Sequence, residues 1–110
     1  MAVLRIADLP DDPLEAAARF HGDALPEIRQ AMIAKPDHLT LVFAPAGYAH
    51  TSWRLAAVQA LARKYAPIRV NALASDDDDA IAAAAQYCER GGAVTGQLLR
   101  LDGNGAGAVL

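Results

Sequence analysis

The sequence contains only one cysteine, Cys88, among its 110 residues. A single thiol cannot form a disulfide within the chain, so a fold held by internal disulfides is excluded. Such low cysteine use is typical of reducing compartments, and we expect a cytoplasmic location. Cys88 shares a helical spacing with Ile81 and Ala85. We therefore expect a small buried side chain here rather than a nucleophile.

Long apolar runs and clusters of basic residues are also missing. No segment approaches the roughly 18 apolar residues of a membrane-spanning helix, so we expect no membrane contact. The first stretch, MAVLRIADLPDD, is too short and too acidic for a signal peptide. Ten Lys and Arg residues stand against 13 Asp and Glu residues, giving a formal net charge of -3. Without a basic patch, nucleic acid is not an expected partner.

Hydrophobic residues nevertheless make up 54% of the chain, which argues against intrinsic disorder. Much of this fraction is alanine, so we expect a core with few bulky side chains. The length of 110 residues is typical of a single domain, here residues 1–110.

Segments of strand and helix character alternate along the chain. The predicted strands are 2–6, 39–44, 68–74 and 96–103, and the predicted helices are 14–32, 51–65 and 76–90. Strands that alternate with helices through short connections indicate βαβ units and a parallel sheet. The order β-α-β-α-β-α-β therefore predicts an α/β domain of about four parallel strands. Residues 104–110 are expected to form a flexible or docked tail.

Helix boundaries are indicated by local signals. Asp12 followed by Pro13 predicts the cap and first position of the first helix, and Ser75 is expected to cap the third. Pro26 should kink or split the first helix. One stripe of this helix is expected to cover the sheet; it comprises Leu14, Ala17, Ala18, Leu25, Ile28 and Met32.

Three stretches go beyond a general α/β pattern. They are LARKYAPIRVNALA (61–74), AVTGQLLRLDG (93–103) and the helix AARFHGDALPEIRQAM (17–32), which leads to LTLVFAP. In this order they resemble the second half of the short-chain dehydrogenase/reductase family, over about residues 14–103. The resemblance implies a truncated Rossmann-like fragment of two or three layers. In this fragment the first strand stands in for the family's fourth.

The resemblance also implies a catalytic tyrosine and, four residues later on the same helix, a lysine. The lysine charge favours the phenolate and so lowers the tyrosine pKa. Four residues after Tyr48 stands Ser52, and the other possible register places Gly47 and Thr51 at the two positions. Neither register supplies a lysine, and Arg54 comes two residues too late.

Other parts of the family's site are missing as well. The only glycine cluster, GNGAG (103–107), follows the last predicted strand and opens no helix, so it is not a phosphate-binding loop. The family's serine is replaced by the pair at 44–45, and SDDDD (75–79) leads into the next helix without a lid. With the lysine, these losses predict a non-catalytic relative that binds no cofactor.

Tyr48, His50 and Ser52 are accordingly interpreted as remnants of a catalytic site. The alternative is an oxidoreductase fragment that uses NAD or NADP and is completed by another chain. Tyr48 would then act with His50 as its helper, although loop residues this close usually point to solvent.

Two further kinds of site receive little support. His21, His38 and His50 lie on separate predicted elements without the spacing of metal ligands, so no metal is expected. The run 76–79 is expected to form a solvated first helical turn, with a partner contact as the alternative. A small-ligand site at the carboxyl ends of the strands, near 45–50 and 75–78, is a third interpretation. Its acidic residues argue against phosphate-bearing ligands.

A second apolar stripe on the first two helices suggests an interface. Its members are Phe20, Ala24, Ala31, Trp53, Ala56 and Ala60. Small residues let helices approach closely, and in short-chain dehydrogenases the two equivalent helices build the main dimer interface. The other interpretation is that these alanines are present only because alanine favours helices and tolerates exposure to water. Half a fold would also leave its first strand as an exposed edge. We therefore expect a homo-oligomer, dimer or tetramer, or assembly with a full-length paralogous dehydrogenase.

Overall fold

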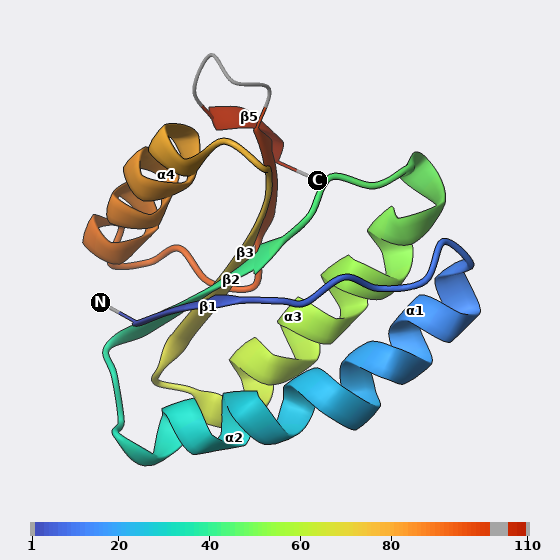
Figure 1. Ribbon diagram of the computed structural model, residues 1–110. Coiled ribbons are helices and arrows are strands. Elements are labelled where there is room, and N and C mark those ends of the chain that lie inside the picture. Colours follow the sequence, from blue (N-terminus) through green and yellow to red (C-terminus); the bar gives the residue numbers. More distant parts are fainter. Residues whose placement is uncertain (1, 102–105, 110) are drawn as a thin grey trace.

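The computed structural model describes residues 2–101 and 106–109. At its centre lies a five-stranded sheet with the strands side by side in chain order (Figure 1). They are β1 (Ala2–Arg5), β2 (His38–Phe43), β3 (Arg69–Ala74), β4 (Leu98–Leu101) and β5 (Ala106–Val109). The first four are parallel, and β5 is antiparallel to β4. The α/β fold with four parallel strands is confirmed.

Of the expected flexible or docked tail, residues 106–109 are docked, because they extend the sheet as β5. This segment pairs with β4 through Leu99–Val109 and Leu101–Ala106. Residues 104, 105 and 110 of the same stretch lie outside the described residues. The sequence AGAV carries too few bulky side chains to signal a strand, and only pairing with β4 makes it one.

The helices form two layers, one on each face of the sheet (Figure 1). One layer contains α1 (Pro13–Arg19), the π-helical turn η1 (Phe20–Ala24), α2 (Leu25–Ile33) and α3 (Thr51–Tyr65). A short 3₁₀ turn, η2 (Tyr48–His50), leads into α3, and α4 (Asp78–Arg90) alone covers the other face. The described part of the chain therefore has three layers. None of the helices within the described residues has the length and apolar character needed to traverse a bilayer.

The helix caps show what local sequence does and does not determine. A carboxylate oxygen of Asp12 accepts a hydrogen bond from the Glu15 backbone N–H at 3.0 Å, and Pro13 is the first residue of α1, as predicted. The predicted cap of α4 is wrong. Asp77 accepts from the N–H groups of the next turn, whereas Ser75 accepts from the Asp77 N–H and so shapes the preceding turn.

The first helical segment is split, as Pro26 suggested, but a π turn precedes the proline. Every fourth residue is buried in this segment, namely Ala16, Phe20, Ala24, Ile28 and Met32. An α-helix has 3.6 residues per turn, so such a stripe would drift around it. The π turn has more residues per turn than an α-helix, so it keeps this stripe on the side that faces the sheet. The predicted stripe is therefore wrong at its start, and Leu14 is 81% exposed.

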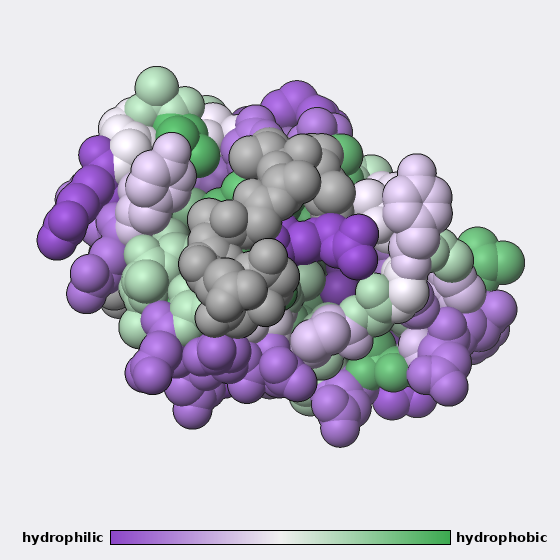
Figure 2. All heavy atoms as spheres, turned by 90° about the horizontal axis from the view of Figure 1, so that it is seen from above, coloured by the Kyte–Doolittle hydropathy of each residue, from purple (hydrophilic) through white to green (hydrophobic). Residues whose placement is uncertain are grey.

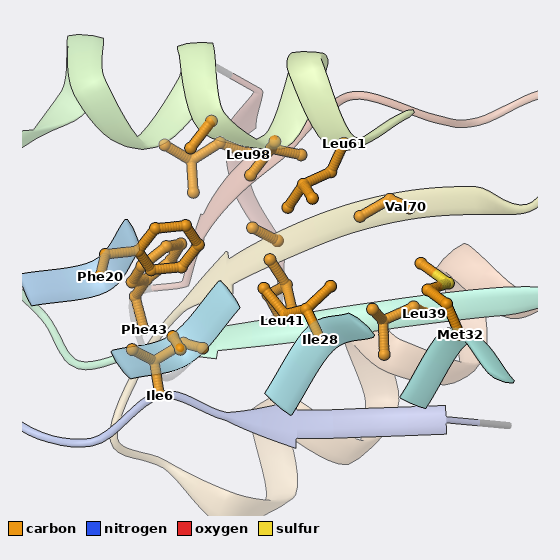
Figure 3. Packing of buried hydrophobic residues seen from close by; sticks show 14 residues of the cluster. Ile6, Phe20, Ile28, Met32, Leu39, Leu41, Phe43, Leu61, Val70 and Leu98 are labelled. Atoms are coloured by element: carbon orange, nitrogen blue, oxygen red, sulfur yellow. The ribbon is translucent and has the colours of Figure 1, made fainter. Parts of the chain in front are cut away.

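Because the buried stripe differs from the predicted one, two of the expected interface residues are buried in the core. Phe20 is 1% and Ala24 7% exposed, and both belong to the core beneath α1 and α2. Figure 3 shows Phe20 directed toward Phe43 of β2, and the ring centroids lie 5.6 Å apart. Phe20 and Ala24 therefore do not form an outward surface of the chain.

The central strand β2 is buried along its whole length. Leu39, Leu41 and Phe43 point into the core under α2 and α3 (Figure 3). Val42 faces the second core, under α4. This burial on both faces explains the continuous apolar run and confirms the predicted parallel strand.

β1 forms one edge of the sheet, as expected, because it pairs only with β2. Its side chain Val3 is 43% exposed. Arg5 forms an exposed ion pair with Asp78 at the start of α4, with 3.0 Å between Nη2 and Oδ1. The outer backbone groups of β1 lie where another strand would pair.

Candidate functional site

A cavity of about 620 Å³ opens at the carboxyl ends of β1 and β2. Its walls are the connection from β1 to α1, the connection from β2 to α3, and the first turns of α3. The lining includes Ile6, Leu9, Asp11, Phe43, His50 and Arg54. In open α/β sheets ligands bind beyond the carboxyl ends of the strands, which makes this cavity the candidate site.

His50 fastens two walls of the cavity together. Its Nδ1 accepts a hydrogen bond from Trp53 Nε1 at 3.0 Å, because the indole nitrogen can only donate. Its Nε2 therefore carries the proton and donates to the Asp11 carbonyl oxygen at 2.9 Å. The imidazole is 8% exposed, contrary to the expected solvent-facing position. Both ring nitrogens thus serve to hold the β1–α1 connection against α3.

Tyr48 and Ser52, the other remnant candidates, do not join His50 in a site. Tyr48 is 80% exposed, and among the described residues its hydroxyl has no hydrogen-bond partner. Ser52 is exposed on the first turn of α3. The structure therefore places these three residues near one another in the chain without the contacts that proton transfer requires.

Arg54 is the most unusual side chain of the cavity. It is 6% exposed, and its Nη1 donates to the Ala44 carbonyl oxygen at 3.0 Å. The guanidinium carbon lies 4.5 Å from the centroid of the Phe43 ring. Its Nε is buried without a partner, and no carboxylate of the described residues pairs with it. Burial lowers the pKa of Arg54, because leaving water disfavours the charged form.

A polar cluster is buried at the opposite end of the sheet, under the end of α4. Asn71 Oδ1 accepts from the Gln97 N–H at 3.0 Å, and its Nδ2 donates to the Val94 carbonyl oxygen at 2.9 Å. These two partners fix the orientation of the amide. Its Nδ2 therefore also donates to His38 Nε2, at 2.8 Å. Nδ1 of the imidazole then carries the proton and faces Thr40 Oγ1 at 3.2 Å.

His38 is consequently a neutral, structural histidine. Burial is the main reason why its pKa is lowered, and the nearby Arg69 adds to this, while Glu89 acts in the opposite direction. Glu89 Oε2 lies 3.6 Å from His38 Nδ1, which is not an ion pair while the ring is neutral. Arg69 donates three hydrogen bonds to carbonyl oxygens at the end of α4, those of Cys88, Glu89 and Gly91.

The remaining candidate residues fall on different parts of the structure. Cys88 is fully buried, as expected, and burial raises the pKa of its thiol. Within the described residues no group of three or more His, Cys, Asp and Glu side chains could hold a metal. Of the expected interface residues, Ala56 and Ala60 are exposed on α3, whereas Ala31 and Trp53 are half-buried against the core.

The sequence contained a signal for the burial of Arg54. It was missed because Arg54 was considered only as a possible substitute for the catalytic lysine. Arg54, Val58 and Leu61 are spaced four and three residues apart, which puts them on one face of a helix. All three are buried in the structure. An arginine in register with a buried apolar stripe indicates a buried cation. The acidic run at 76–78, by contrast, does not line the cavity.

Comparisons with known proteins agree with the fold. The family model described as "SDR-like: Short chain dehydrogenase-like protein" matches residues 4–101. No curated protein and no solved structure matched the chain.

Proposed function

The chain belongs to the short-chain dehydrogenase-like family, and we propose that it is a non-catalytic member that acts as a structural or interaction subunit. It assembles with itself or with a full-length paralogous dehydrogenase. The observation that carries this proposal is the state of the catalytic positions. Tyr48 stands 80% exposed, and the position of the lysine is taken by Ser52 in one register and by Thr51 in the other.

The chemistry supports a non-catalytic role. A tyrosine acts as an acid or base near neutral pH only when a neighbouring cation stabilises its phenolate. The first lysine of α3 is Lys64, near its far end. His50 cannot replace it, because Trp53 and Asp11 occupy both of its nitrogens. His50 thus serves to hold the chain together.

The surface supports assembly. The outer face of α3 carries the exposed small residues Ala56 and Ala60, and β1 is an open edge. Figure 2 shows the side of the molecule that lies at the top of Figure 1, where hydrophobic residues form small separate patches among hydrophilic ones. We assign the interface to the helical face that contains α3, because Ala56 and Ala60 are exposed there. Small residues allow close helix packing, and symmetric self-association is the commonest form of oligomer. The cytoplasmic location stays a prediction from the single cysteine.

The native mass, measured by light scattering over a dilution series, tests this function. We expect a dimer or tetramer for the wild-type chain and dissociation for Ala56→Glu, because the charge would be buried at the helical interface. Ala82→Glu is the matched control, since Ala82 is also an exposed helical alanine but lies on α4. A monomeric wild-type chain, or equal masses for both variants, would contradict the proposal.

The alternative, an oxidoreductase fragment completed by another chain, makes a different prediction. Equilibrium dialysis of the isolated chain with NADH and with NADPH would then show binding at about micromolar concentration, which falls within the usual range for cofactors and substrates. The non-catalytic proposal expects no such binding. Dialysis in the presence of a co-purifying dehydrogenase would distinguish a completed enzyme, in which this chain adds to cofactor binding, from a structural complex, in which it does not.

A further inference from the structure

Arg54 is a buried cation that has no anionic partner among the described residues. Two ion pairs occur among the described residues, Arg5–Asp78 and Arg19–Asp23, and neither involves Arg54. The contact with the Phe43 ring and the bond to the Ala44 carbonyl oxygen compensate only part of its lost hydration, since Nε stays without a partner. A buried charge without a counter-ion is strongly unfavourable, and replacement by an apolar residue is often neutral or stabilising.

The surroundings of Arg54 favour a negative ligand. The side chain lines the cavity of about 620 Å³ at the carboxyl ends of β1 and β2. Gly47, which precedes η2, and His50, which precedes α3, line the same cavity. No side chain caps either turn. The positive end of the α3 dipole and the guanidinium therefore act on the same space.

We propose that this cavity binds a small organic carboxylate with an apolar body, and that Arg54 is the counter-ion of the carboxylate. The carboxylate meets the terminal nitrogens of the guanidinium, because Nε lies below the surface. Ile6, Leu9 and Phe43 offer an apolar wall for the rest of the ligand. This inference is independent of the proposed assembly, because the ligand site lies within one chain.

The charges around the cavity favour a single negative charge on the ligand. Arg54 supplies one full positive charge, and Asp8 and Asp11 contribute exposed carboxylates to the same lining. A phosphate dianion would meet these two carboxylates with only one cation to offset them. A monoanion is balanced by the guanidinium alone.

Trp53 provides a direct signal of binding. It is the only tryptophan of the chain, and its ring centroid lies 5.9 Å from the guanidinium carbon of Arg54. The purified chain is titrated with sodium hexanoate while indole fluorescence is recorded, and calorimetry measures the affinity. Hexanol serves as the neutral control, sodium chloride matches the ionic strength, and inorganic phosphate tests the competing anion. We expect saturable binding of hexanoate and no saturable binding of hexanol or phosphate.

Variants of Arg54 separate a ligand site from a structural role. Arg54→Met should weaken hexanoate binding by about tenfold or more, because it removes a charge-assisted hydrogen bond. Without ligand, this variant should melt at the same temperature as wild type or higher, since an unpaired buried charge is gone. Arg54→Lys keeps the charge and should bind with intermediate affinity. Asp11→Asn should strengthen binding, because it removes a like charge and leaves the carbonyl bond of His50 in place.

Several results would overturn the proposal. They are the absence of hexanoate binding by wild type, equal binding by wild type and Arg54→Met, and a preference for phosphate over hexanoate. If Arg54→Met fails to fold, unchanged hexanoate affinity in Arg54→Lys together with no gain in Asp11→Asn would overturn it as well. The oligomer mass does not enter this test, so its failure leaves the assembly proposal intact.

Discussion

Replacement of Asn71 by alanine should destabilise the fold strongly. Three groups lose their partner at once, namely the Gln97 N–H, the Val94 carbonyl oxygen and His38 Nε2. Leaving a buried polar group unsatisfied costs about 1–3 kcal/mol. Because water can reach some of the freed groups, we expect Asn71→Ala to lower the free energy of unfolding by about 3–5 kcal/mol.

That loss is large for a domain of this size, whose whole stability is typically about 5–15 kcal/mol. Urea denaturation at one fixed protein concentration measures it, since assembly would otherwise change the apparent stability. Gln97→Ala is the control, because within residues 2–101 and 106–109 its side chain makes a single long hydrogen bond, from Nε2 to the Thr95 carbonyl oxygen at 3.4 Å. This control should change stability by less than about 0.5 kcal/mol. A loss below about 1 kcal/mol for Asn71→Ala would refute the reasoning.

Two further predictions concern titratable groups. Burial and then Arg69 lower the pKa of His38 in the folded state, with Glu89 on α4 acting against them, so the unfolded chain binds the proton more readily. The urea midpoint should be highest above pH 6.5, which is the pKa of a free imidazole. It should fall as the pH decreases below 6.5, because the unfolded chain then takes up the proton. His38→Gln should flatten this fall, whereas a profile unchanged from that of wild type would contradict the assignment. The buried Cys88 thiol, whose pKa is raised, should react with a disulfide reagent at least about a hundredfold more slowly in the native protein than in denaturant.

Short-range signals predicted much of this fold. The cap at Asp12 and the bounds of α3 follow from residues a few positions apart, and the burial of β2 on both faces follows from its unbroken apolar run. The π turn at Phe20 was not predictable in this way. It exists because a stripe of every fourth residue must stay on the sheet, which is a tertiary requirement. β5 likewise depends on a partner strand that is already in place.

The candidate site was predictable in position but not in its contacts. The resemblance and the order of strands both placed it after β2, where the cavity lies. The role of His50 could not be read from the sequence, because its partner Asp11 is 39 positions away. Arg54 could have been found from its helical spacing to Val58, since that argument needs only residues on one helix.

The two buried titratable residues of the cavity, His50 and Arg54, differ in what they require of the fold. His50 is fully satisfied by Trp53 and Asp11, so its presence is explained by stability alone. Arg54 is not explained in this way, because a buried guanidinium without an anion costs free energy that methionine or leucine would avoid. A chain that only needed to assemble would be better served by such a replacement. The buried charge of Arg54 therefore indicates that the cavity binds a ligand, whereas the residues around it, such as His50, have a structural role.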